Sequence, residues 1–186
     1  GNLYLQEEIK DLIVAIMAII DLDNDIYNIS FLKSPMIGLS DLQVMDINGS
    51  EGNIYEKLHL NKGKYSDVLE IYDSLIHNYN INNPYEFINY LIEYLEYEEV
   101  LLFSKNWKNK IANLSKFKTI LLADYGKGYI NYEDLLGYLL ELEGKQEDRV
   151  QVEGEDSNVV RLMSIHKSKG LEYKVVIVPN LIRKAT

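Results

Sequence analysis

The sequence contains no cysteine, which excludes disulfide bonds and any metal or redox site built on thiolates. Proline is scarce, with three in 186 residues, and no uncharged apolar run reaches the length of about 18 residues that a membrane helix needs. The most apolar segment, "LIVAIMAII" at 12–20, covers only about half of a bilayer span. These absences, with a hydrophobic content of 47%, predict an ordered globular chain without a membrane partner, from a reducing compartment.

The N-terminus lacks the basic segment followed by an apolar one that marks a secretory signal peptide. Position 1 is Gly, where a complete reading frame has Met. We therefore expect an excised or engineered piece of a longer, cytoplasmic protein.

The formal net charge is -10, which argues against the whole chain being a nucleic-acid-binding surface. The charge is uneven along the sequence. The stretch "ELEGKQEDRVQVEGED" holds seven acids and two bases, whereas residues 159–186 hold six bases and the single acid Glu172. A basic end therefore follows an acidic segment.

Apolar residues at three-to-four spacing predict helices through most of residues 1–143. The first helix carries an apolar stripe that is too wide for a surface helix, so we expect it at the centre of the core. The predicted long helices span about 6–21, 65–79, 84–97, 100–124 and 132–142.

Local signals predict where some of these elements start and stop. Pro35 and Gly38 should interrupt regular structure, with Ser40 then capping a short helix. Asn83, Pro84 and Glu86 form a complete helix-start signal, in which Glu86 closes a capping box. The segment at 49–66, "GSEGNIYEKLHLNKGKYS", is predicted to be a loop.

Five lysines lie within the predicted helix at 100–124 or at its start, with no acid between them. They form either a basic face or a solvated helix side, and composition favours the second interpretation. The five are Lys105, Lys108, Lys110, Lys116 and Lys118.

The character of the chain changes after residue 143. Residues 144–158 are acidic, polar and punctuated by glycine, which is typical of a linker. In residues 159–186, "NVVRLMSI" and "YKVVIVP" bracket a polar loop and have the pattern of buried strands. The predicted fold class is therefore mainly α, with a helical domain followed by a strand-loop-strand piece of an incomplete α/β domain.

Several kinds of chemistry can be set aside. No G-x-x-x-x-G-K-[ST] phosphate loop occurs in the sequence, and His59, His77 and His166 have no metal-binding spacing. Ser164 and Lys167 match the S-x-x-K nucleophile pattern, but the S-D-N and K-T-G partners of that pattern are absent.

The loop "SIHKSKGLE" at 164–172 combines a hydroxyl, an imidazole, two ammonium groups and a glycine after a predicted strand. Such groups at the carboxyl edge of a sheet can bind an anion, and lysines in a solvated turn would have the same pattern. Spacing alone leaves both interpretations open.

The segment "VVRLMSIHKSKGLEYKVVIVP" at 159–179 resembles motif V of UvrD/Rep-type superfamily 1 DNA helicases, most of all the AddA and RecB-like helicase-nuclease subunits. Two looser similarities to AddA-type proteins agree in order and spacing: "FLKSPMIGLSDLQV" at 31–44, and the stretch from "NLSKFKTILL" onward that precedes motif V. The resemblance thus covers nearly the whole chain.

The resemblance implies that residues 1–143 are most of a helical 2B-type insertion, that 144–158 are the linker, and that 159–186 return to the RecA-like domain 2A. In this family ATP lies between two RecA-like domains that grip single-stranded DNA. The resemblance implies that Ser164 and His166 approach the DNA backbone or a base, and that Lys169 joins DNA to nucleotide. It also implies that Gly170 allows the tight turn and that Glu172 faces the nucleotide, so both belong to the coupling of DNA to nucleotide. Lys167 lies outside the family pattern, but an ammonium at this position suits contact with phosphate.

The implied cofactors are ATP and Mg²⁺ in the parent protein, with none expected for this piece alone. The implied partners are single-stranded DNA, bound weakly by this piece, the rest of the helicase chain and a second helicase-nuclease subunit, in the bacterial cytoplasm. Two alternatives stay open: a noncatalytic helical module that docks proteins or regulates, and a degenerate family member that is noncatalytic by nature.

Overall fold

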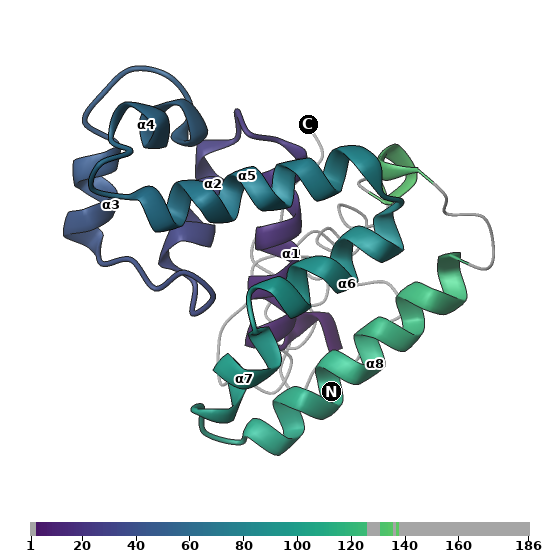
Figure 1. Ribbon diagram of the computed structural model, residues 1–186. Coiled ribbons are helices and arrows are strands. Elements are labelled where there is room, and N and C mark those ends of the chain that lie inside the picture. The colour runs from purple at the N-terminus through teal and green to yellow at the C-terminus, as the bar shows by residue number, and fades with distance from the viewer. Residues whose placement is uncertain (1–2, 126–130, 136, 138–186) are drawn as a thin grey trace, which may run out of the picture. The chain divides into compact units, whose positions relative to one another are not determined.

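The computed structural model describes residues 3–125, 131–135 and 137. Within these residues every regular element is helical, which confirms the prediction of a mainly α chain (Figure 1). The linker predicted at 144–158, the strand-loop-strand piece predicted at 159–186 and the end of the helix predicted at 132–142 lie outside the described residues. The elements are η1 (Leu3–Leu5), α1 (Glu7–Ile20), α2 (Asp25–Lys33), α3 (Asp41–Ile47), α4 (Ile54–Leu60), α5 (Ser66–Ile81), α6 (Pro84–Tyr94), α7 (Tyr97–Leu102) and α8 (Trp107–Tyr125).

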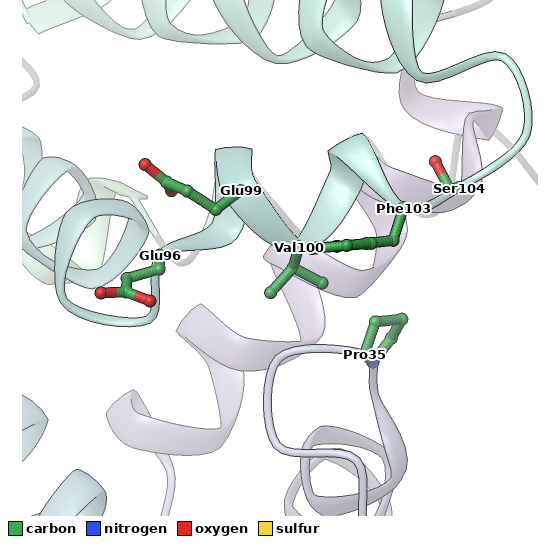
Figure 2. A pocket seen from close by; sticks show the side chains of 6 residues that line it. All are labelled: Pro35, Glu96, Glu99, Val100, Phe103 and Ser104. Atoms are coloured by element: carbon green, nitrogen blue, oxygen red, sulfur yellow. The ribbon is translucent and has the colours of Figure 1, made fainter.

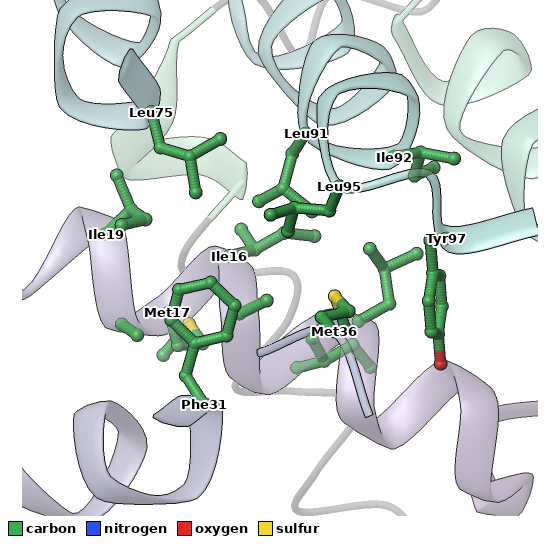
Figure 3. Packing of buried hydrophobic residues seen from close by; sticks show 14 of the residues in the cluster. Ile16, Met17, Ile19, Phe31, Met36, Leu75, Leu91, Ile92, Leu95 and Tyr97 are labelled. Atoms are coloured by element: carbon green, nitrogen blue, oxygen red, sulfur yellow. The ribbon is translucent and has the colours of Figure 1, made fainter. Parts of the chain in front are cut away.

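Helix α1 is the centre of the core, as its wide apolar stripe predicted. It packs against α2, α5 and α8, and its residues from Leu12 to Ile19 are buried apart from Val14, which is partly buried. Figure 3 shows side chains of α1 meeting Phe31 of α2, Leu75 of α5 and Leu91 of α6. A helix that is apolar almost all round is stable in water only when other helices surround it.

Helix α2 was not predicted, and a polar contact inside the core helps to position it. The side chain of Asn28 is fully buried, and its Nδ2 donates to the carbonyls of Asp21 (3.1 Å) and Asn24 (2.9 Å). Its Oδ1 accepts a hydrogen bond of 2.8 Å from the hydroxyl of Tyr72 on α5. Because every polar group of this amide has a partner, its burial ties α2 to α5 without an unsatisfied group.

The turn between α2 and α3 confirms the predicted break at Pro35 and Gly38. Gly38 has a φ of 75° and donates its N–H to the carbonyl of Ser34 (2.7 Å), a conformation that glycine adopts without strain. Ser40 then caps α3, with a capping box completed by Gln43. The predicted N-cap is confirmed.

The loop predicted for 49–66 is wrong, because α4 lies within it. Asn53 accepts from the N–H of Glu56 (2.9 Å), while the Glu56 carboxylate accepts from the N–H of Asn53 (2.9 Å). This capping box satisfies donors that a helix start leaves free. The apolar side chains of Ile54 and Leu58 are then fully buried, so the short helix is held by its cap and by the core.

Helices α5 and α6 follow the prediction closely at their starts. Asn83 accepts from the N–H of Glu86 (2.9 Å), and Pro84 occupies the first helical position, although the reciprocal contact of a capping box is not formed. The predicted end near Tyr97 is wrong, since α6 stops at Tyr94 and Glu96 takes a left-handed conformation with φ 49°. The chain then starts α7.

The single helix predicted for about 100–124 is two helices. Helix α7 ends at Leu102, and α8 begins at Trp107 after Asn106, which has a φ of 58°. A left-handed residue cannot continue a right-handed helix, so the chain turns between residues 102 and 107. This turn lets α8 pack against α7, α6 and α1.

Candidate functional site

The six residues that the sequence singled out as a site lie outside the described residues. They are Ser164, His166, Lys167, Lys169, Gly170 and Glu172. Their assignment to DNA and nucleotide contacts therefore stays a prediction. For the described residues, the ion pairs and hydrogen bonds show which helices each polar side chain joins.

The lysines near α8 do not form one free basic face. Lys110 pairs with Glu7 of α1 at 3.0 Å, and Lys118 pairs with Glu98 of α7 at 3.3 Å. Lys105, Lys108 and Lys116 are exposed. Two of the five charges thus serve contacts between helices, which agrees with the interpretation of a mostly solvated helix side.

The start of α1 is fastened to α7 and α8 by polar contacts, which we call the α1 clasp. It consists of the Glu7–Lys110 ion pair, the buried Glu8 carboxylate accepting from Nδ2 of Asn113 (2.8 Å), and the Tyr97 hydroxyl donating to the Glu8 carbonyl (2.8 Å). Its members lie 89 to 105 residues apart in sequence, and only packing brings them together.

Asp11 lies one turn beyond the α1 clasp and has a strongly shifted pKa. Burial is the first cause, and repulsion from the Glu7 carboxylate is the second. Lys110 opposes the shift and Glu8 adds to it, so the pKa of Asp11 rises from 3.8 to about 6. The burial of Tyr97 likewise raises the pKa of its phenol.

Two other polar contacts join neighbouring elements. Asp46 of α3 accepts from Nζ of Lys64 (2.6 Å) and the hydroxyl of Tyr65 (2.7 Å), and these hydrogen bonds lower the pKa of its carboxyl. Tyr55 of α4 donates to Asp73 of α5 (2.5 Å), and this contact raises the pKa of the phenol to about 12. The first contact joins α3 to the turn between α4 and α5, and the second joins α4 to α5.

In the part of the chain that the structure describes, no cluster of His, Asp and Glu could hold a metal ion. Among the helices of those residues, none is both long and apolar enough to cross a membrane.

One open hollow of about 450 Å³ lies between the turn after α2 and helix α7. We call it the α7 hollow, and its lining is Pro35, Glu96, Glu99, Val100, Phe103 and Ser104. Figure 2 shows Pro35 facing Val100 and Phe103, with both carboxylates at one side. The Ser34 hydroxyl, buried beside Pro35, donates to the Phe31 carbonyl (2.7 Å).

Sequence reasoning missed this hollow because it placed residues 100–124 in one continuous helix. A helix through residues 103–106 would have carried Phe103 along the α8 surface. The local signal was "FSKN", where Ser104 and Asn106 favour a turn. The facing wall, with Pro35, belongs to the stretch "FLKSPMIGLSDLQV".

The class of protein follows from the comparison with known protein families. The model of the UvrD-like helicase C-terminal domain matches residues 1–186, and the chain belongs to this family. The resemblance to UvrD-type helicases in the sequence is thereby confirmed.

The relatives are proteins named as subunits of an ATP-dependent helicase/nuclease. Those of Clostridium beijerinckii and Clostridium acetobutylicum are each 29% identical, over 97% and 94% of this chain. The protein of Clostridium perfringens is 30% identical over 95% of this chain. The chain spans only 15% to 16% of the length of these relatives.

Proposed function

We propose that this chain is the 2B-type insertion and the motif V segment of an ATP-dependent DNA helicase of the helicase-nuclease type. The observation that carries the proposal is the family match along all of residues 1–186, together with relatives named as ATP-dependent helicase/nuclease subunits. The helical body of residues 3–125 agrees with an insertion that precedes motif V.

In this proposal the helical body is a rigid arm on the motor. The α1 clasp fixes α7 and α8 to the start of helix α1. The helical body would therefore move as one rigid unit relative to the RecA-like domains. Residues 144–158 join the arm to the motor, and residues 159–186 carry the loop that contacts DNA.

The proposed roles in the loop combine the family pattern with the chemistry of the side chains. Ser164 and His166 approach the DNA backbone or a base, and Lys169 lies in the polar network that joins DNA to nucleotide. The ammonium of Lys167 attracts phosphate oxygens. Gly170 permits the tight turn, and Glu172 faces the nucleotide. Through these contacts, ATP binding and hydrolysis would change how tightly the loop binds DNA.

ATP and Mg²⁺ belong to the parent protein in this proposal. The described residues do not fit either one, because they include no metal-holding cluster, and the sequence has no phosphate-binding loop. We therefore expect no ATPase activity from this chain alone. The parent's partners would be DNA, the rest of the helicase chain and a second helicase-nuclease subunit.

The decisive experiment uses the full reading frame that contains this chain. We expect a G-x-x-x-x-G-K-[ST] motif upstream and an arginine-containing motif VI downstream. In that protein, Lys169→Ala should lower the DNA-stimulated ATPase rate by at least about tenfold, the effect of removing one well-placed charged contact. The matched control Lys184→Ala, also in the basic end, should leave the rate within about twofold.

A frame without these motifs would contradict the helicase proposal and favour a degenerate family member that is noncatalytic by nature, whereas no DNA binding at all by the chain would favour the noncatalytic docking module. For the chain alone, we expect weak binding to oligo-dT. If about three phosphates are engaged, log K should fall with log salt at a slope near -2, since each contributes roughly 0.7. Tight binding that is independent of salt would contradict the assigned DNA contacts.

A further inference from the structure

The α7 hollow is an open surface depression that combines apolar side chains with an acidic side. Pro35, Val100 and Phe103 supply carbon surface, and Glu96 and Glu99 supply two carboxylates (Figure 2). In the described part of the chain neither carboxylate forms an ion pair with lysine or arginine, whereas the neighbouring Glu98 pairs with Lys118. The hollow therefore holds uncompensated negative charge beside apolar surface.

The aromatic ring of Phe103 is exposed to water, which is unfavourable for an apolar side chain. Its side chain is 93% exposed, the highest value among the large apolar residues that the structure describes. The adjacent Leu102 is 49% exposed. Since removing an aromatic ring from water is favourable, this ring is available to stabilise a contact with another molecule.

The backbone conformation at the two ends of α7 fixes the positions of the residues that line the hollow. Glu96 lies at the start of α7 in a left-handed conformation, with φ 49°. At the other end, the N–H of Phe103 donates to the Val100 carbonyl (3.3 Å) and the Ser104 hydroxyl donates to the Leu101 carbonyl (2.7 Å). A non-glycine residue with positive φ is strained, and such residues occur preferentially at functional positions.

We propose that the α7 hollow binds a polypeptide segment in which an aromatic or aliphatic side chain is flanked by lysine or arginine. The apolar side chain would stack on Phe103 and Val100 against Pro35. The flanking cations would pair with Glu96 and Glu99, which supplies the charge complementarity that selects this partner.

The charge of the lining favours polypeptide over nucleic acid at this surface. Carboxylates at the side of the hollow repel phosphates, and the nearest base in sequence, Lys105, is not part of the lining. The proposal does not depend on the motif V loop or on helicase activity.

The test measures binding of a fluorescein-labelled peptide, Gly-Lys-Arg-Leu-Phe-Lys-Arg-Gly, to the full 186-residue chain by fluorescence anisotropy. We expect saturable binding with a Kd on the order of 100 μM, since the contact is far smaller than a standard protein interface. A peptide with Glu in place of each Lys and Arg should not bind. Equal binding of both peptides would overturn the charge complementarity on which the proposal rests.

Two variants and two matched controls assign the binding to the hollow. Phe103→Ala should weaken binding about tenfold, as truncation of a central anchor does. Glu99→Lys should weaken it about fivefold at low salt and less at high salt. The controls are Leu42→Ala, at a residue that is 78% exposed on α3, and Glu70→Lys, at an exposed position on α5.

Both controls should bind as the unchanged chain does. Far-UV circular dichroism checks that each variant is folded, which the exposure of these positions leads us to expect. Unchanged binding by Phe103→Ala would overturn the proposal. So would binding of an oligo-dT strand that Phe103→Ala abolishes, because this surface would then bind nucleic acid.

Discussion

Replacing Asp11 with asparagine should stabilise the protein at neutral pH and have almost no effect in acid. Asp11 lies partly buried on α1, near the carboxylates of Glu7 and Glu8 and the ammonium of Lys110. Burial and the two carboxylates make its charged form unfavourable in the folded protein. An amide of the same shape carries no charge, so Asp11→Asn removes that cost.

The magnitude follows from the pKa of Asp11, which is raised from 3.8 to about 6. At about 1.36 kcal/mol for each pH unit, the folded state loses at most about 3 kcal/mol relative to the unfolded state as pH rises from below about 4 to above about 6. Because the side chain is only partly buried, solvent screening reduces this figure, and we expect about 1 kcal/mol. The sign is that of a raised acid: its contribution to stability is lost as pH rises.

The assay is urea unfolding of the protein and of Asp11→Asn, followed by circular dichroism at pH 4.0 and pH 7.5. The free energy of unfolding of the variant should exceed that of the unchanged protein by about 1 kcal/mol at pH 7.5 and by a few tenths at most at pH 4.0. Glu70→Gln, at an exposed position on α5, is the control for loss of one negative charge. An equal gain at both pH values, or a loss at pH 7.5, would show that the charge on Asp11 does not destabilise the folded state.

Three further predictions concern single contacts and are measured by the free energy of unfolding. Tyr72→Phe should cost about 1–2 kcal/mol, because it leaves the buried Oδ1 of Asn28 without its donor; a cost below about 0.3 kcal/mol would contradict this role. Asn53→Ala should cost about 1 kcal/mol through loss of the α4 cap, and Asn53→Ser, which keeps a capping oxygen, should retain most of the stability. Gly38→Ala should cost about 1 kcal/mol from its φ of 75° alone, since an added Cβ would have no neighbour within 4 Å; an unchanged midpoint would show that the turn relaxes.

Local patterns account for the parts of the fold that were predicted correctly. The apolar stripe of α1, the cap at Ser40 and the start at Asn83 and Pro84 each depend on residues within one or two turns. The missed helix α4 also had a local signal, the capping box of Asn53 and Glu56.

The break between α7 and α8 has a different explanation. Apolar residues continue at helical spacing from Val100 through Leu121, so periodicity alone favours one helix. The core favours two, because the left-handed Asn106 lets α7 bury Tyr97 and Leu101 while α8 buries Leu114. The free energy gained by burying these side chains exceeds the conformational free energy that the left-handed Asn106 costs.

Patterns of contiguous residues were enough to establish the helical class and the family, and to single out the loop at 164–172 as the predicted contact for DNA and nucleotide. Helix packing was needed to establish that Lys110 pairs with Glu7, that Asp11 is partly buried, and that the side chain of Phe103 projects into solvent. Such contacts join residues as much as 105 positions apart. They depend on the angles and distances at which helices pack, which no local pattern specifies.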